Sequence, residues 1–125
     1  MSLPRSSVDY LNNMAAEIEL VSQFIDGYSF EMFEADRKTW YAVVRELLVI
    51  GEAAKRVPES VRDRAPTVPW RLITGMRDRL VHDYDRVILN VVWSTVRDDL
   101  PLLLPAIHKL RDELVTEEPP RTEES

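Results

Sequence analysis

Apolar residues recur along most of the chain at intervals of three and four positions, which is the spacing of one face of an α-helix. The predicted helices cover approximately residues 8–26, 28–35, 37–57, 59–64, 70 to 82 or 84, and 90–115. Ser6 or Ser7, Ser29 and Asp36 stand where helix N-caps belong, because their side-chain oxygens can accept hydrogen bonds from free backbone N–H groups. No stretch shows the sustained alternation of a strand. The pattern predicts an all-α bundle of four to five helices.

Two of these helices carry features that bear on packing. In the helix from about Trp70 we expect four residues to face inward: Leu72, Ile73, Met76 and Leu80. The last helix has a long apolar stripe, formed by Val92, Val96, Leu100, Leu103, Ile107, Leu110 and Leu114. Pro101 and Pro105 each remove a backbone donor from it, so we expect a kink there, or a break with Asp98 or Asp99 capping a new helix.

A glycine interrupts the apolar face of the third predicted helix. Gly51 in a helix interior costs roughly 1 kcal/mol relative to alanine, so it usually marks the close approach of another segment. Glu52 follows it, and we expect this carboxylate to form a salt bridge at an interface.

Composition limits the class of protein. The 125 residues suit one domain, predicted over 8–115, between a flexible N-terminus (1–7) and a disordered acidic tail (116–125). Without cysteine there is no disulfide framework and no cysteine-based metal site. The N-terminus lacks the apolar region of a signal peptide, and no apolar run approaches the roughly 18–20 residues that span a membrane. We therefore expect a soluble, cytoplasmic protein with no membrane partner.

Charge is distributed unevenly along the chain. The net charge is −6, which argues at first against a nucleic-acid partner. From Lys55 to Arg86, however, eight basic residues stand against five acidic ones, a local net of +3. From Asp112 to Ser125 six acidic residues stand against one arginine, a local net of −5. This asymmetry permits RNA binding without indicating it.

The stretch Met76–Asp85, MRDRLVHDYD, is where the sequence indicates chemistry. It brings Arg77, His82 and Tyr84 into about two helical turns. A guanidinium can neutralise charge on a phosphodiester, and an imidazole can transfer protons at neutral pH. These groups suit cleavage of RNA without a metal ion, which would leave a 2′,3′-cyclic phosphate. The other histidine, His108, lies on a different predicted helix, and no metal-ligand spacing appears, so we expect neither a metal nor a cofactor.

The spacing within this stretch sets a geometric condition. Residues five apart lie about 140° apart around an α-helix, so Arg77 and His82 would not share a face. They can converge if the helix ends near His82, or if a second copy completes the site across a two-fold axis. Asp78 and His82 are four apart and do share a face, so Asp78 is a candidate supporting residue that orients the imidazole.

With these residues the chain resembles HEPN-domain toxins of the HepT family, partners of the minimal nucleotidyltransferase antitoxin MntA. The R-x4-H-x-Y motif at Arg77, His82 and Tyr84 carries the resemblance. Further stretches support it: DRKTW (36–40), IGEAAKR (50–56), VPW (68–70) and VVWSTVRDDLP (91–101). The family often has asparagine directly after the arginine, where this chain has Asp78.

The resemblance implies a fold, an activity and a partner. It implies a HEPN-type helical bundle that forms a homodimer with the two motifs facing each other in a cleft. It implies the toxin of a type VII toxin–antitoxin system, an endoribonuclease with Arg77 and His82 as the catalytic pair. It also implies that an MntA-like antitoxin silences the toxin by attaching AMP to Tyr84, within a homodimer or a larger hetero-oligomer. The alternative is a non-catalytic helical dimer that binds RNA or a partner protein through the same cleft.

Overall fold

The computed structural model describes residues 6–82 and 88–117, and these two ranges contain helices and short connections but no strand. Long helices form the body of the fold: α1 (Ser7–Phe24), α3 (Arg37–Arg56), α5 (Trp70–His82) and α7 (Leu100–Glu117). Shorter elements connect them: α2 (Phe30–Ala35), α4 (Glu59–Arg62), α6 (Leu89–Ser94) and the π-helical segment η2 (Thr95–Asp99). The predicted all-α architecture is confirmed.

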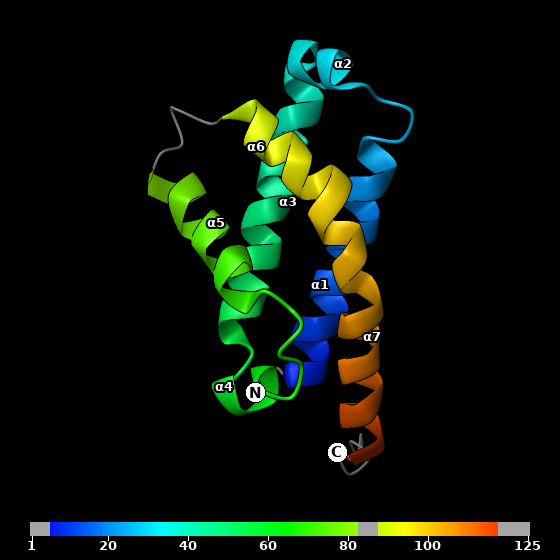
Figure 1. The fold of residues 1–125 in the computed structure, drawn as a ribbon, viewed down its shortest axis with the longest axis vertical. Coiled ribbons are helices and arrows are strands. Elements are labelled where there is room, and N and C mark those ends of the chain that lie inside the picture. The colour runs from blue at the N-terminus through cyan, green and yellow to red at the C-terminus, as the bar shows by residue number, and fades with distance from the viewer. Residues whose placement is uncertain (1–5, 83–87, 118–125) are drawn as a thin grey trace, which may run out of the picture.

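The helices are arranged so that α5 lies at one edge of the bundle. Helix α1 packs against both α3 and α7, and α3 packs on its other side against α5 (Figure 1). In Figure 1 the order across the molecule therefore runs from α5 through α3 and α1 to α7. Because α3 is its main neighbour, α5 leaves much of its surface uncovered, and this is the helix that carries the predicted motif.

The predicted caps begin the helices as expected. The Ser6 hydroxyl accepts from Asp9 N, and Ser6 N donates to the Asp9 carboxylate, which together form a capping box. The Ser29 hydroxyl caps α2 by accepting from Met32 N, and the Asp36 carboxylate caps α3 by accepting from Thr39 N. Asp36 also accepts hydrogen bonds from the hydroxyls of Thr39 and Tyr28, both at 2.7 Å. These hydrogen bonds, Thr39 first, hold the pKa of Asp36 below its ordinary value.

The core follows the helical spacing closely, with one exception. All seven residues of the predicted stripe on the last helix are buried, from Val92 to Leu114. On α5, Ile73 and Leu80 are buried and Met76 is partly buried, as expected. Leu72, predicted to face inward, is instead 72% exposed. It is adjacent to Ile73, and a helix that packs mainly against α3 cannot turn both side chains toward it.

The prolines of the last helix are accommodated by a wider turn, and the helix does not break at Asp98 or Asp99, which was one of the two expected outcomes. The N–H of Leu100 donates to Thr95 O, the hydrogen-bond spacing of a π-helix, in the segment η2 that directly precedes Pro101. Proline cannot donate and its ring crowds the preceding carbonyls, so the wider turn accommodates Pro101 without ending the helix. The helix then continues through Pro105 to Glu117.

The ends of the domain differ slightly from the predicted boundaries. Helix α1 begins at Ser7, which lies within the predicted flexible segment 1–7. Helix α7 includes Thr116 and Glu117, where the Glu117 carboxylate pairs with the Arg64 guanidinium after α4. The remainder of the predicted tail lies outside the described residues. Within the described ranges, no helix combines the length and apolar character needed to cross a membrane.

Candidate functional site

Arg77 is positioned by the contact between α5 and α3. The start of α5 is anchored by Trp70, which is buried and donates its indole N–H to Ala65 O at 3.2 Å. One and two turns further on, Ile73 and Arg77 cross α3 at Gly51. A Cβ atom at Gly51 would overlap Arg77 Cβ and lie 2.8 Å from Cγ and 3.3 Å from Ile73 O. The expected close approach at Gly51 is confirmed, and the segment that approaches carries Arg77.

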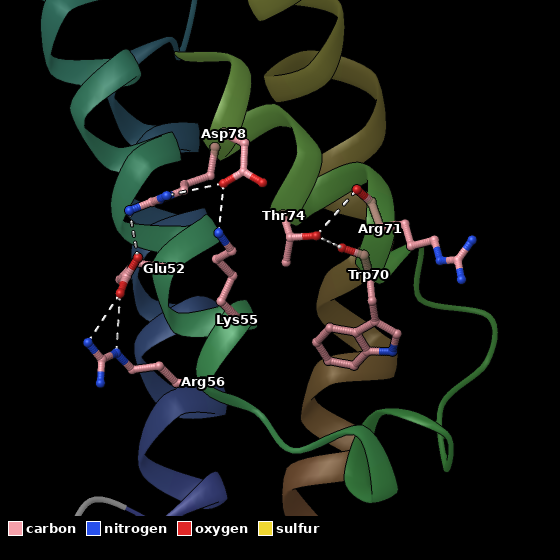
Figure 2. Close-up of polar contacts among 8 residues, drawn as sticks. Glu52, Lys55, Arg56, Trp70, Arg71, Thr74 and Asp78 are labelled. Carbon is pink, nitrogen blue, oxygen red and sulfur yellow. Dashed lines mark hydrogen bonds and ion pairs between the residues drawn. The ribbon is translucent and has the colours of Figure 1, made fainter. Parts of the chain in front are cut away.

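Two carboxylates hold the Arg77 guanidinium. Its Nη2 lies 3.1 Å from Glu52 Oε2 on α3, and its Nη1 donates to Asp78 Oδ1, also at 3.1 Å. Glu52 also pairs through Oε1 with Arg56, one turn further along α3. Figure 2 shows Glu52 and Arg56 on one side of this cluster, with Asp78 above Lys55. A guanidinium with five N–H donors that uses two in this way retains others for a ligand.

Asp78 is occupied by neighbouring cations. Its Oδ1 accepts from Lys55 Nζ at 2.7 Å as well as from Arg77. The hydrogen bond from Lys55, and to a lesser extent the one from Arg77, holds the pKa of this carboxyl below its ordinary value. Among the described residues Asp78 forms no hydrogen bond or ion pair with His82, although the two share a face of α5. The structure therefore joins Asp78 to Arg77, where the spacing had suggested His82.

His82 is the last residue of α5 and is exposed. It forms no hydrogen bond or ion pair with another residue in 6–82 or 88–117. Since α5 is helical from Trp70 through His82, the two motif residues point about 140° apart around it. Both routes to convergence, a helix end near His82 and a second copy of the chain, stay predictions. Tyr84 lies outside the described residues.

Arg77 opens into a groove of about 410 Å³ between α1, α3 and α5. Its charged lining consists of Arg45, Arg56 and Arg77 with the single carboxylate of Glu52, a net of +2. Its floor is apolar, and Tyr10 and Asn13 of α1 form the opposite wall. This basic surface includes the motif residue Arg77. Local sequence carries no signal for Tyr10, Asn13 or Arg45, because only the packing of α1 on α3 brings them here.

The remaining histidine and the acidic residues form no second centre in the described ranges. His108 lies on the surface of α7, where its Nε2 is 3.8 Å from Glu19 Oε1 of α1. No group of three histidine, cysteine or carboxylate side chains that could hold a metal ion occurs within 6–82 and 88–117. The polar chemistry that can be described therefore concentrates at the α3–α5 contact.

Comparison with known proteins identifies the family. The family model described as "Ribonuclease HepT-like" matches residues 14–110. A protein of Thermococcus cleftensis named "Probable ribonuclease HepT" is 43% identical over 109 residues, which cover 87% of this chain and 99% of that protein. "Putative RNase TTE0752" of Caldanaerobacter subterraneus is 39% identical, covering 82% of this chain and 89% of that protein. No solved structure matches the chain. By the family model that covers most of its length and by its identity with these relatives, the chain belongs to the ribonuclease HepT-like family.

Proposed function

We propose that the protein is a metal-independent endoribonuclease and the toxin of a type VII toxin–antitoxin pair. The observation that carries this proposal is the placement of Arg77. Core packing at Gly51 fixes its stem, two carboxylates hold its guanidinium at the edge of a basic groove, and His82 is exposed at the end of the same helix. A family of proteins named as ribonucleases supports the choice of substrate.

The two side chains divide the chemistry of RNA cleavage between them. The His82 imidazole removes the proton of a ribose 2′-OH or donates one to the leaving 5′-oxygen. The 2′-oxygen forms a bond to phosphorus as the bond to the 5′-oxygen breaks, which gives a 2′,3′-cyclic phosphate and a 5′-hydroxyl. The Arg77 guanidinium neutralises the charge that develops on the phosphoryl oxygens in the transition state.

A second copy of the chain completes the site in this proposal. Within one chain Arg77 and His82 point about 140° apart, so one phosphodiester is poorly placed to reach both from a single α5. Two-fold symmetry places the His82 of each copy opposite the Arg77 of the other. Helix α5 suits this arrangement because it lies at the edge of the bundle and is open on its outer side (Figure 1).

Silencing acts on Tyr84 in the proposal. AMP attached there by an MntA-like nucleotidyltransferase adds bulk and a negative charge two residues from His82, where RNA phosphate is expected. Incubation with such an enzyme and ATP is expected to add one AMP mass to the wild-type chain, measured on the intact protein. The same mass gain in Tyr84→Phe would place the modification elsewhere.

The non-catalytic alternative rests on a specific observation. Asp78 puts a carboxylate directly against Arg77, and carboxylates repel phosphate. A helical dimer that only binds RNA would tolerate this better than a nuclease.

The deciding experiment is RNA cleavage by the purified protein in the presence of EDTA. Wild type is expected to cut RNA and leave a 2′,3′-cyclic phosphate, while Arg77→Ala and His82→Ala lose most of the activity. His108→Ala is the matched control, because that histidine lies on α7 away from the groove. RNA that stays intact with wild type but still binds to it would support the alternative.

A further inference from the structure

The groove beside Arg77 has a shape and lining that the cleavage chemistry alone does not require. Arg45 and Arg56 lie on α3 along the same groove as Arg77. Arg56 shares Glu52 with Arg77, whereas Arg45 forms no hydrogen bond or ion pair within the described part of the chain. In addition to Arg77, the groove is therefore lined by an arginine, Arg45, whose N–H donors are available to a ligand.

The other walls suit a flat, partly polar group. Leu48, Val49 and Ala53 form an apolar floor, and the Tyr10 side chain and the Asn13 amide line the α1 side. Neither of these two side chains has a hydrogen-bond partner among the residues described. Nucleobases are recognised by such groups, since they stack on aromatic rings and pair their edges with amides.

The size of the groove limits its occupant. Its volume of about 410 Å³ falls in the lower part of the ~300–1,000 Å³ range of small-molecule sites. The bases of a duplex are stacked inside the helix and cannot reach an aromatic wall. One unpaired nucleotide fits, with its base on the floor and its phosphates toward the arginines.

A second copy of the chain is the competing occupant. In a two-fold contact the same patch meets itself. That would bring Arg45 and Arg56 of one copy close to their counterparts, with a net positive charge on both sides and only the Glu52 carboxylates, already paired with Arg56 and Arg77, to offset it. Charge complementarity therefore favours a polyanion over a second protein surface.

From these observations we infer that the groove is a binding subsite for one unpaired nucleotide of the RNA, next to the phosphate held by Arg77. Arg45 and Arg56 bind its phosphates, and Tyr10 contacts its base. This inference rests on the proposed nuclease function and adds to it a preference for single-stranded RNA.

The test measures RNA binding separately from cleavage. Each variant is placed in the His82→Ala protein, and its affinity for a short unstructured RNA is measured by fluorescence anisotropy over a series of salt concentrations. Arg45→Gln is expected to weaken binding and to lower the slope of log affinity against log salt by about 0.7, the value for one lost contact to a single strand. Tyr10→Leu is expected to weaken binding at least about fivefold, and Tyr10→Phe to restore it. Duplex RNA of the same sequence is expected to compete poorly.

Arg71→Gln is the matched control. It removes the same charge, but Arg71 lies on α5 with its side chain directed away from the Glu52 and Arg56 cluster (Figure 2). An equal loss of affinity in Arg71→Gln and Arg45→Gln would indicate a general charge effect and overturn the subsite. Circular dichroism of each variant verifies that the helices are retained.

The remaining outcomes separate the subsite from the nuclease. If wild type cleaves RNA while Arg45→Gln and Tyr10→Leu bind it as tightly as their parent, the subsite is wrong and the nuclease stands. If wild type neither binds nor cleaves RNA, the proposed function is lost, and the subsite with it. A change of mass in light scattering for Arg45→Gln, with RNA affinity unchanged, would assign the groove to contact between copies.

Discussion

Gly51 on α3 lies directly against the stem of Arg77 on α5, so closely that a methyl group at Gly51 would overlap Arg77 Cβ. The absence of one side chain on α3 thus allows the arginine of the motif to pack against that helix. This contact joins the stability of the bundle to the geometry of the site, because the same atoms serve both.

We expect Gly51→Ala to destabilise the protein and to reduce RNA cleavage. Alanine favours helix by about 1 kcal/mol, but the overlap with Arg77 forces α5 outward at a cost typical of overpacking, ~1–3 kcal/mol. The net loss is expected to be about 1 kcal/mol, measured by urea unfolding. Gly75→Ala is the control, because a Cβ at Gly75 in α5 meets no atom within 4 Å. It should stabilise by up to ~1 kcal/mol, and the idea fails if both variants shift stability in the same direction.

We expect Asp78→Asn to increase RNA cleavage by a few-fold. The change removes a negative charge from the side of Arg77 and releases Lys55, so the local field becomes more attractive to phosphate. The matched control is Asp112→Asn on α7. Asp112 pairs with the adjacent Arg111 much as Asp78 pairs with Arg77, but it lies away from the groove. The measurement is the initial rate of cleavage of one RNA substrate by each variant. Unchanged or slower cleavage by Asp78→Asn would show that the carboxylate is needed to hold Arg77.

We expect inactive variants to restore one another when mixed. If each site takes Arg77 from one copy and His82 from the other, a dimer of Arg77→Ala and His82→Ala has one intact site. Random exchange between equal amounts of the two variants makes half of the dimers mixed. Each mixed dimer has one intact site of its two, so about a quarter of wild-type cleavage should return. Native mass spectrometry verifies exchange between subunits. Complete exchange without recovered activity would place both groups of one site in the same chain.

We expect Glu46→Gln to stabilise the protein only at high pH. Burial raises the pKa of Glu46 from 4.5 to about 7, and the neighbouring Glu17 carboxylate adds to the rise. Its Oε2 is buried and has no hydrogen-bond partner among the residues the structure describes. Because the folded pKa lies above the unfolded one, the stabilising contribution is complete below about pH 4.5 and is lost as the pH rises through about 7.

Glutamine imitates the protonated carboxyl, so this variant should match wild type near pH 4.5. It should exceed wild type by on the order of 1 kcal/mol at pH 8.5, the scale of one unsatisfied buried group. Urea unfolding at the two pH values measures the difference. Glu34→Gln, at an exposed position of α2, should show no such dependence on pH. A gain that is equal at both pH values would mean that charge is not the cause.

The fold was largely predictable because each helix buries a stripe at regular spacing. The caps at Ser6, Ser29 and Asp36 and the buried stripe from Val92 to Leu114 follow from local sequence. The exposure of Leu72 did not, since it depends on which face of α5 meets α3. The wider turn of η2 was not predicted either. Proline excludes the normal α-helical hydrogen bond at its position but does not determine which pattern replaces it.

The site was predictable only in part. Spacing indicated Arg77 and His82 and showed that one helix cannot bring them together. Spacing within one helix made Asp78 a candidate partner of His82, whereas in the structure its Oδ1 accepts from Lys55 of α3 and from Arg77. Glycine in mid-helix signalled the crossing at Gly51, but the two carboxylates that hold Arg77 became evident only from the packing of α3 on α5.

The two carboxylates on Arg77 also affect which anions the protein responds to. Cells contain abundant free nucleotides, and an unpaired arginine in an open groove would be occupied by them much of the time. Glu52 and Asp78 already accept from both terminal nitrogens of Arg77 and offset its charge, so a small anion gains little from the donors that remain. An RNA bound at several phosphates at once keeps each phosphate at a high effective concentration near its site, so it binds more tightly than a small anion does. We therefore expect Arg77 to bind free mononucleotides weakly at concentrations that saturate simpler phosphate sites, and so to remain available for long RNA.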